Sequence, residues 1–456
     1  MISKKVVAFG LLSLACTSHA FAAVSSQEAS ALGGDLTEFG AIKAGNADGS
    51  IPPYTGGLTQ VPAGMDVREA KWVDPYAGEK PLFRITSENM AKYADKISDG
   101  VKKLMLDNKD YYLDVYPTHR SLAYPDDFLK ATVRNATSCH TTKDGLAVED
   151  GCRGGIPFPI PKTGNEVMWN KMLANWGDQS WESKKVSMWM LNQDGKAVLT
   201  NLMHTITEKP YYQVQLGDRP ENLYSRVIGY TEGPSRKAGE INGTNQFLDP
   251  LADPRKAWQY TTGQRRVKLA PEFSYDTPMA VLGGAMFYDE LFLFDGTMDR
   301  FDFKLLGKKE MFINANNFNT TFNCKVDKLF VGHHVNPECE RWELRRVWVV
   351  EATLKPGMRH ANSKRMYYFD EDGYTAGLMD GWDQAGKLSR TGINYSLIAP
   401  DVKAQNGASF VVYNFNRGML AFQSDLSTDP NSTMRYIKPL RESELSPEFV
   451  SSGGLR

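Results

Sequence analysis

The most regular pattern of hydrophobic and polar positions in the chain lies at residues 341–354. Every second residue from Trp342 to Leu354 is apolar except Arg346, and the positions between them are mainly charged residues and valine. Successive side chains of a strand point to opposite faces, so this stretch predicts a long strand with one apolar side. A Lys-Pro-Gly turn at 355–357 and a second apolar run at 364–369 follow, which predicts an antiparallel hairpin.

The same alternation predicts further strands along most of the chain. Runs at 185–191 and 197–203 flank an Asn-Gln-Asp-Gly turn and indicate one hairpin, and runs at 257–262 and 265–269 indicate another. The remaining predicted strands are 211–216, 225–231, 287–294, 300–306, 374–382, 388–398 and 409–422, with 287–294 and 300–306 expected to pair across a turn at 295–296. So many strands joined by short turns imply one large antiparallel sheet.

Three helices are predicted to accompany this sheet. Apolar residues recur at helical spacing at 87–106 and at 163–176, and a shorter helix is expected at 124–131. A sheet of this size curls, closes or has its open face covered, and the two longer helices are natural covers. The predicted fold class is therefore α+β, mainly antiparallel β, with a large curved sheet or incomplete barrel and helices over its concave face.

The N-terminus has the pattern of a cleaved signal peptide at 1–22. Two lysines precede an apolar run at 6–15, and Ala20-Phe21-Ala22 supplies small residues before cleavage at Ala23. The run is too short for a membrane helix, which needs about 20 apolar residues. No later segment is apolar enough to span a bilayer. Export to the periplasm is expected, followed by a loop-rich and helical segment at 23–120, the sheet domain at 121–440 and a peripheral tail at 441–456.

Cys16 raises the alternative of an outer-membrane lipoprotein. It stands at the end of the apolar run, but Ser13 occupies the position where a bacterial lipobox usually has leucine. A soluble mature protein is therefore favoured over a lipid-anchored one.

The other four cysteines form two close pairs in the sequence, Cys139 with Cys152 and Cys324 with Cys339. Four cysteines allow three connectivities, and an oxidising compartment with short spacing favours the two sequential disulfides. A metal site would recruit His140 to the first pair and the histidines at 333–334 to the second. Neither pair has the short spacing of a typical zinc site, so disulfides are favoured.

Composition and charge exclude some functions and leave others open. With 53 basic and 54 acidic residues the formal net charge is −1, so nucleic-acid binding has no support. Hydrolase serine and phosphate-loop motifs are absent from the sequence. An acidic cluster invites a paired-carboxylate or metal reading, although a salt-bridged hairpin is favoured: Asp295, Asp299, Asp302 and Glu310.

Two shorter motifs allow a functional interpretation but favour a structural one. Asp370-Glu-Asp-Gly373 resembles part of a calcium loop but lacks the final glutamate of the twelve-residue pattern, so a turn is favoured. His119 beside Arg120 could bind an anion, and a connecting loop is again the favoured interpretation.

Several motifs resemble one exported bacterial family. The most specific is the run from Arg341 to Gly357, and the others include Leu36-Thr-Glu-Phe-Gly40, Tyr116-Pro-Thr-His-Arg120, Gly155-Ile-Pro-Phe-Pro159, Gly263-Gln-Arg-Arg-Val267 and Asp299-Arg-Phe-Asp302. The family is the domain of unknown function number thirteen twenty-nine, often labelled outer membrane lipoprotein-sorting protein-like. The resemblance spans nearly all of the mature chain.

The resemblance implies a fold similar to the LolA/LolB lipoprotein carriers, with an incomplete barrel, helices at its open side and an apolar cavity. It also implies a link to an inner-membrane transporter of the resistance-nodulation-division type. The family has no established catalytic residues, so none is carried over. Arg345 stands where the family usually has histidine, which argues against essential chemistry at that position.

The function expected from these observations is that of a non-enzymatic carrier or chaperone for a lipid or lipoprotein-like ligand, without a cofactor. The chain has 9 tryptophans, 22 phenylalanines and 20 tyrosines, and a concave apolar face could hold such a ligand. A structural partner in the cell envelope and a lipid or polysaccharide hydrolase are the alternatives. The predicted ligand-binding residues, which could equally fill a packed core, are Trp342, Arg346, Trp348, Val350, Leu354, Trp189 and Trp258.

Overall fold

The structure is a computed structural model that describes residues 24–149, 151–174, 180–213, 220, 222–271 and 273–453. The predicted signal peptide at 1–22 and Cys16 lie outside the described residues. Within the described part of the chain, no helix is both long enough and apolar enough to cross a membrane.

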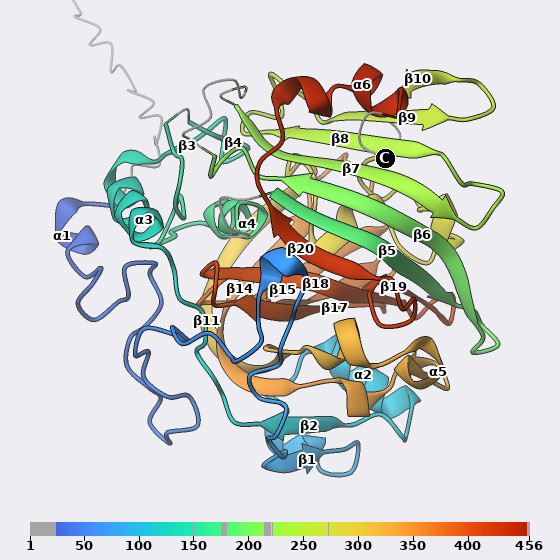
Figure 1. Ribbon diagram of the computed structural model, residues 1–456. Helices are drawn as coiled ribbons and strands as arrows, with labels where there is room; N and C mark the ends of the chain where they lie inside the picture. Colours follow the sequence, from blue (N-terminus) through green and yellow to red (C-terminus); the bar gives the residue numbers. More distant parts are fainter. Residues whose placement is uncertain are drawn as a thin grey trace, which may run out of the picture.

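One 16-stranded, almost entirely antiparallel sheet forms the body of the protein (Figure 1). Its first half along the chain holds β5 (Ser180–Leu191), β6 (Ala197–Glu208), β7 (Leu223–Gly233), β8 (Ile241–Phe247), β9 (Lys256–Thr261) and β10 (Arg266–Leu269). Its second half holds β11 (Phe301–Asn314), β14 (Trp342–Leu354), β15 (Asn362–Asp370), β16 (Gly377–Asp383), β17 (Leu388–Ala399), β18 (Ala404–Asn414), β19 (Met419–Asp425) and β20 (Thr433–Ile437). β1 (Phe83–Ile85) and β2 (Leu113–Tyr116) extend it beside β14.

The two halves join where β19 and β20 pair with β5. From there the order runs through β18, β17, β16 and β15 to β14 and β11 on one side, and through β6 to β10 on the other. No pairing joins β11 to β10 among the described strands, so the sheet is open. The predicted fold class, a large open antiparallel sheet with few helices, is confirmed.

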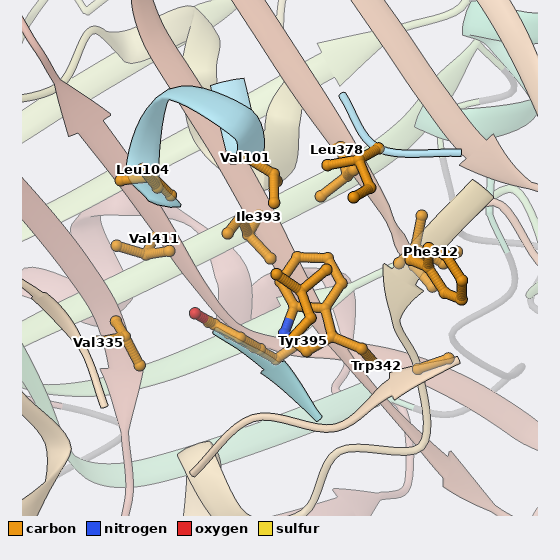
Figure 2. Packing of buried hydrophobic residues seen from close by; sticks show 14 of the residues in the cluster. Val101, Leu104, Phe312, Val335, Trp342, Leu378, Ile393, Tyr395 and Val411 are labelled. Carbon is orange, nitrogen blue, oxygen red and sulfur yellow. The ribbon is translucent and has the colours of Figure 1, made fainter. Parts of the chain in front are cut away.

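Helices pack on both halves of this sheet. α2 (Asp99–Asp107) contacts β16 and β17, and its Val101 and Leu104 belong to one hydrophobic cluster with Leu378, Ile393 and Val411 (Figure 2). α4 (Gly164–Met172) contacts β11 and β14 in a second cluster. α3 (Asp126–Ser138) packs beside α1 (Ser26–Ala29), and short helices are α5 (Val326–Leu329) and α6 (Pro447–Ser451). The two-stranded pairs are β3 (Thr141–Thr142) with β4 (Ala147–Val148), and β12 (Phe330–Val331) with β13 (His334–Val335).

β14 is buried on both faces, whereas its alternation predicted one apolar side. Trp342 lies in the α2 cluster together with Val347 and Val349 from the other parity, and Val350 lies in the α4 cluster. The charged positions Glu343 and Arg345 are buried as well. The reason is that β11, β15 and the N-terminal segment surround the strand, so its charges find partners inside the protein.

Four other predicted elements differ from the structure. Residues 211 and 212 of the strand predicted at 211–216 form a turn, and residues 214–216 lie outside the described residues. The helix predicted at 87–106 is split into the short 3₁₀ helix η2 (Met90–Tyr93) and α2, because the Ser98 hydroxyl accepts from the Val101 amide and caps a new helix. The strand predicted at 409–422 is two strands, β18 and β19, joined by a turn at 415–418. The strand predicted at 287–294 is the 3₁₀ helix η4 (Tyr288–Leu293), and β11 pairs with β14 instead.

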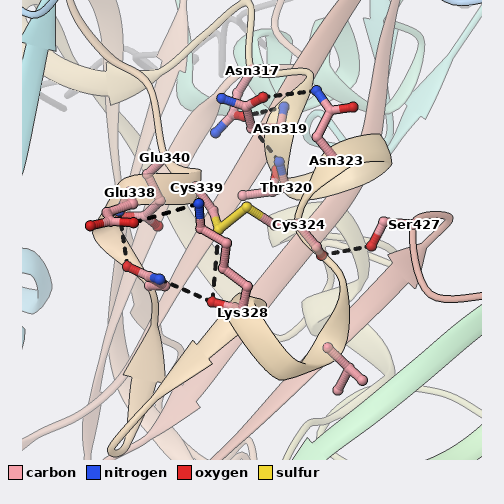
Figure 3. The surroundings of a disulfide bond; sticks show 12 residues. Asn317, Asn319, Thr320, Asn323, Cys324, Lys328, Glu338, Cys339, Glu340 and Ser427 are labelled. Atoms are coloured by element: carbon pink, nitrogen blue, oxygen red, sulfur yellow. Dashed lines mark hydrogen bonds and ion pairs between the residues drawn. A yellow bond between two sulfur atoms is a disulfide. The ribbon is translucent and has the colours of Figure 1, made fainter.

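Both disulfides have the predicted sequential pairing. Cys324–Cys339 joins the end of the π-helix η5 (Asn319–Asn323) to the 3₁₀ helix η6 (Pro337–Cys339) (Figure 3). Asn317 caps η5 through bonds from the Asn319 and Thr320 amides, and the Ser427 hydroxyl donates to the Cys324 carbonyl at 2.6 Å. The disulfide therefore ties η5 to η6, and the Ser427 hydrogen bond attaches this loop region to the segment that follows β19.

The C-terminal residues pack on the β7–β10 half of the sheet. Leu445 in η7 (Glu442–Leu445) and Val450 in α6 are buried in a cluster with Ile228, Tyr230 and Trp258. Figure 1 shows α6 lying beside the end of the sheet formed by β8 to β10. The apolar spacing of this short tail was too sparse to predict the contact.

A buried carboxylate holds the start of β14 in the α2 cluster. Glu340 accepts hydrogen bonds from the Tyr395 hydroxyl (2.7 Å), the Tyr111 hydroxyl (2.8 Å) and the Trp342 indole (3.1 Å). Burial raises the pKa of Glu340 to about 7, although these three donors oppose the shift.

Replacing Glu340 with alanine is expected to lower the free energy of unfolding by about 3 kcal/mol, because three buried donors lose their acceptor. Urea unfolding at neutral pH measures the change. Glu338→Ala is the matched control, since the Glu338 side chain is 61% exposed, and a change within about 0.5 kcal/mol is expected there. Equal effects of the two substitutions would contradict the role given to Glu340.

Candidate functional site

A cavity of about 560 Å³ lies against one face of the β5–β9 half of the sheet. Its wall on β6 and β7 is formed by every second residue, as expected for one face of a strand: Asn201, Met203, Thr205 and Thr207, then Ser225, Val227, Gly229 and Thr231. β8 contributes Asn242, Thr244 and Gln246, and β17 to β19 contribute Asn394, Phe410 and Gln423. The volume lies within the usual range of ligand sites, about 300 to 1,000 Å³.

The opposite wall of the cavity comes from residues 273–299, which we call the covering segment. It joins β10 to β11 and contains η3 (Ala280–Leu282) and η4. The bond from the Met279 amide to the Met286 carbonyl (2.9 Å) closes it into a loop. Its cavity-lining residues are Phe273, Met279, Ala280, Val281, Tyr288, Leu291, Phe292 and Asp295. The cavity thus lies between the sheet and this segment.

Buried ion pairs hold the covering segment on the sheet. Asp289 accepts from the Arg365 guanidinium of β15 at 2.9 and 3.0 Å, and the His360 ring lies 2.9 Å from the same carboxylate. Glu290 accepts from Arg390 of β17 at 2.7 Å. All five side chains are buried. Arg365 and His360 outweigh the effect of burial and hold the pKa of Asp289 well below its usual value.

Two lysines form a cationic patch in the cavity wall. Lys171, in the last turn of α4, donates to the Phe294 carbonyl, and the Lys209 ammonium lies 3.5 Å from the Met172 carbonyl. Both residues are only 9% exposed. Burial lowers the pKa of Lys171 to about 7 and that of Lys209 to about 8, and Asp295 opposes both shifts.

One acidic group in the same wall already has partners. Asp295 accepts from Arg255 at 3.0 Å and from the Gln246 amide at 2.6 Å, and all three line the cavity.

The rest of the cavity wall is largely apolar and adaptable. The Phe292 and Phe410 rings lie 4.6 Å apart between centroids and are tilted by 45°, and Met203 and Met279 line the same space. Gly229 makes room for Met203, since a β-carbon at that position would lie 2.5 Å from the Met203 methyl group. Methionine side chains adjust their shape readily and suit an apolar ligand of variable conformation.

None of the seven residues predicted to bind a ligand lines the cavity, and six of them lie in packed clusters. Trp342 and Trp189 belong to the α2 cluster, where the Trp189 indole donates to Asp425 at 2.8 Å. Trp258 packs under α6 on the face of the sheet opposite the cavity. Trp348, Val350 and Leu354 pack in or against the α4 cluster. Their contact with a ligand stays a prediction, and the cavity is lined by other residues.

Arg346 lies in a buried ionic network, not at a cavity. Its guanidinium donates to the Ala44 carbonyl at 2.9 Å and pairs with Glu371 at 3.4 Å. Arg345 pairs with Asp370 at 2.7 Å and with Asp372 at 3.0 Å, and Arg120 pairs with Asp372 at 2.6 Å. Residues 371–373 form a turn, as predicted, and its acidic side chains bind arginines, which was not predicted.

The acidic cluster proposed from the sequence separates into individual pairs. Besides Asp295, Asp299 accepts from the Tyr275 hydroxyl at 3.1 Å, Asp302 lies 4.0 Å from Lys355, and Glu310 lies 3.5 Å from Lys96. Among the described residues, no group of three or more histidine, cysteine, aspartate or glutamate side chains is arranged to hold a metal ion. The arrangement at these positions is that of salt bridges and hydrogen bonds.

The cavity was not predicted from the sequence, because the strand faces that line it have the polar composition of solvent-exposed faces. The alternate positions of β6 and β7 carry threonine, asparagine, serine and glycine, with Met203 and Val227 as the apolar members. The sequence did contain a signal. The cavity-facing positions of β6 carry no charged residue, which is unusual for a solvent-exposed strand face, and Glu208 belongs to the opposite face.

The protein is thus an open antiparallel sheet with a cavity under a covering segment, and sequence comparison identifies its family. The model of a protein family described as "Protein of unknown function (DUF1329)" matches residues 84–454. An uncharacterized protein of Pseudomonas aeruginosa is 38% identical over 385 residues, covering 83% of each chain. The chain belongs to the DUF1329 family.

Solved structures show a partial similarity to this chain. A domain described as an outer membrane lipoprotein-sorting protein domain, from Vibrio parahaemolyticus, aligns with a TM-score of 0.41 and 14% identity, covering 63% of this chain and 97% of that one. A DUF1329 family protein from Desulfovibrio piger gives 0.41 and 12%, covering 62% and 96%. A LolA superfamily protein from Nitrosomonas europaea gives 0.36 and 9%, covering 63% and 100%.

Replacing Asp289 with asparagine is expected to lower the free energy of unfolding by about 3 to 5 kcal/mol, because it leaves the buried Arg365 charge without its carboxylate. Denaturant unfolding at pH 7 measures this. Asp302→Asn is the matched control on β11, where the side chain is 71% exposed, and little change is expected. An Asp289 variant as stable as the wild type would show that the pair does not hold the covering segment.

The buried Lys171 also predicts a pH dependence of stability. Its pKa is about 7 in the folded protein and 10.5 when unperturbed, so the unfolded state binds more protons between these values and stability rises with pH there. Lys171→Met removes this contribution. The variant is expected to be more stable than the wild type at pH 6, by an amount on the order of a few kcal/mol, and the difference should shrink by pH 9.5. A difference that is the same at both pH values would contradict the burial of a charged Lys171.

Proposed function

We propose that this protein is a non-enzymatic carrier or chaperone for a hydrophobic ligand, which it holds between the sheet and the covering segment. The observation that carries the proposal is the cavity of about 560 Å³ with its largely apolar wall of methionine, phenylalanine and leucine. Sequestering apolar ligand surface from water contributes about 25 cal/mol per Å² buried, so a single acyl chain could be retained without covalent chemistry.

The sequence supports a location for this function. The predicted signal peptide and the two disulfides fit an exported protein of the periplasm, where lipids and lipid-modified proteins cross an aqueous space. A partner transporter in the inner membrane is an expectation from the family resemblance and belongs to the same proposal. The carrier would load or release its ligand by movement of the covering segment away from the sheet.

The first test is whether the protein carries a ligand when it is purified from the periplasm. Native mass spectrometry is expected to show an added mass of lipid size, which organic extraction removes. Protein that carries no ligand, and that also fails to bind a pyrene-labelled acyl chain added afterwards, would overturn the proposal.

Filling the cavity is expected to weaken binding without unfolding the protein. Val227→Trp places a large side chain in the cavity wall and should weaken binding of a pyrene-labelled acyl chain by about tenfold or more, equivalent to about 1.4 kcal/mol. Val198→Trp is the matched control, since Val198 lies on the neighbouring strand β6, is 36% exposed and does not line the cavity. Equal affinity of the two variants would place the ligand outside the cavity.

A further inference from the structure

The two walls of the cavity differ in chemical character. Every lining residue of the covering segment except Tyr288 and Asp295 is apolar. On the opposite wall, formed by β6 to β9, every lining residue except Met203, Val227 and two glycines carries an uncharged side chain that can form hydrogen bonds. A ligand held between these walls therefore meets an apolar surface on one side and a hydrogen-bonding surface on the other.

The hydrogen-bonding side chains follow the register of the sheet. Thr205 of β6 is the register partner of Gly229 of β7. Gly229 is in turn opposite Asn242 of β8, and Asn242 is opposite Gln259 of β9. Side chains of directly opposite residues lie on the same face of a sheet, so these positions form one row across four strands. Neighbouring strands lie about 4.8 Å apart, which sets the spacing along the row.

A second row lies beside the first. Thr207 of β6 is opposite Val227 of β7, and Val227 is opposite Thr244 of β8. One step further along the strands, Ser225 is opposite Gln246. Side chains on one face of a strand are two residues apart, which corresponds to about 7 Å. The wall therefore presents hydroxyl and amide groups at regular intervals both across the strands and along them.

The groups in these rows are available to a ligand. Among the described residues, the hydroxyls of Thr205, Thr207 and Thr244 and the amide of Gln259 have no hydrogen-bond partner, and their polar atoms are not fully buried. A hydroxyl covered by a purely apolar ligand loses its water and gains no partner, which is unfavourable. Threonine hydroxyls and glutamine amides both donate and accept, so hydroxyl groups on a ligand can satisfy them.

An extended acyl chain matches only one of the two walls. It carries no hydrogen-bonding group along its length, so it would leave the hydroxyls of Thr205 and Thr244 dry and unpaired. A fused ring system with hydroxyl groups on one face and hydrocarbon on the other matches both walls at once. The cavity volume of about 560 Å³ lies in the range of sites that hold molecules of this size.

We propose that the cavity binds a facially amphipathic ligand, a fused-ring hydrocarbon of sterol-like shape with hydroxyl groups along one face. The hydroxyl face lies on Thr205, Thr244 and Gln259, and the apolar face lies against Leu291 and Phe292 of the covering segment. This inference rests on the proposed carrier function and narrows its ligand class. Hydrogen bonds to the sheet set the orientation of the ligand, and the apolar face supplies most of the buried hydrocarbon surface.

The test compares three ligands that share one ring skeleton and one carboxylate: lithocholate, deoxycholate and cholate, which carry one, two and three hydroxyl groups. Each displaces a pyrene-labelled acyl chain from delipidated, full-length mature protein at pH 8, below the concentrations at which micelles form. The wild type is expected to bind cholate about tenfold more tightly than lithocholate, because the two added hydroxyls gain partners on the sheet. A wall without hydrogen-bonding groups would give the opposite order, since each hydroxyl makes transfer out of water less favourable.

Isosteric substitutions then locate the preference. Thr205→Val and Thr244→Val, made together, remove two hydroxyls and keep the shape of the wall. This double variant is expected to prefer cholate by about twofold or less while its affinity for lithocholate is kept. Thr262→Val is the control, since Thr262 is exposed in the turn after β9 and does not line the cavity. Circular dichroism and thermal unfolding establish that each variant is folded.

Three results would overturn this inference alone. They are a wild type that binds lithocholate at least as tightly as cholate, a folded double variant that keeps the full cholate preference, and a pyrene-labelled acyl chain that binds but is displaced by none of the three ligands. In each case the acyl chain still binds, so the carrier function stays intact. Failure of the acyl chain and of all three ligands to bind would instead overturn the carrier function itself.

Discussion

The site depends on buried ion pairs between the covering segment and the sheet. Asp289 with Arg365, and Glu290 with Arg390, hold residues 273–299 across strands that lie far from them in sequence. A buried pair gains little net stability over an apolar contact, but breaking one half of it is strongly unfavourable. Such pairs therefore fix where the segment lies, and the space that remains between it and β6 to β8 is the cavity.

Buried ion pairs also hold a segment in place beside β14 and β15. The Arg345 and Arg120 guanidinium groups hold the acidic turn after β15, and Arg346 reaches the backbone of the N-terminal segment. In both places, charges on strand faces dock a non-sheet segment in one position. The cluster under α2 is a packed core, whereas a lined space lies between the covering segment and strands β6 to β8.

The lining of that space suits reversible binding. Its sheet wall alternates small polar residues with methionine and glycine, and so it neither collapses into a close-packed core nor presents a charged surface.

Local patterns in the sequence determined most of the sheet. Period-two alternation located β5, β6, β9, β10, β14, β15 and β17, and cysteine spacing predicted both disulfides, because these features depend on neighbouring residues. Tertiary structure alone decided that 287–294 is a 3₁₀ helix, since Asp289 and Glu290 find their arginines on distant strands. It also decided that the aromatic face of β14 fills a core while the plainer faces of β6 and β7 line the cavity. Contacts between segments distant in sequence decide which strand faces are covered and by which segment. The periodicity of a single strand contains no information about these contacts.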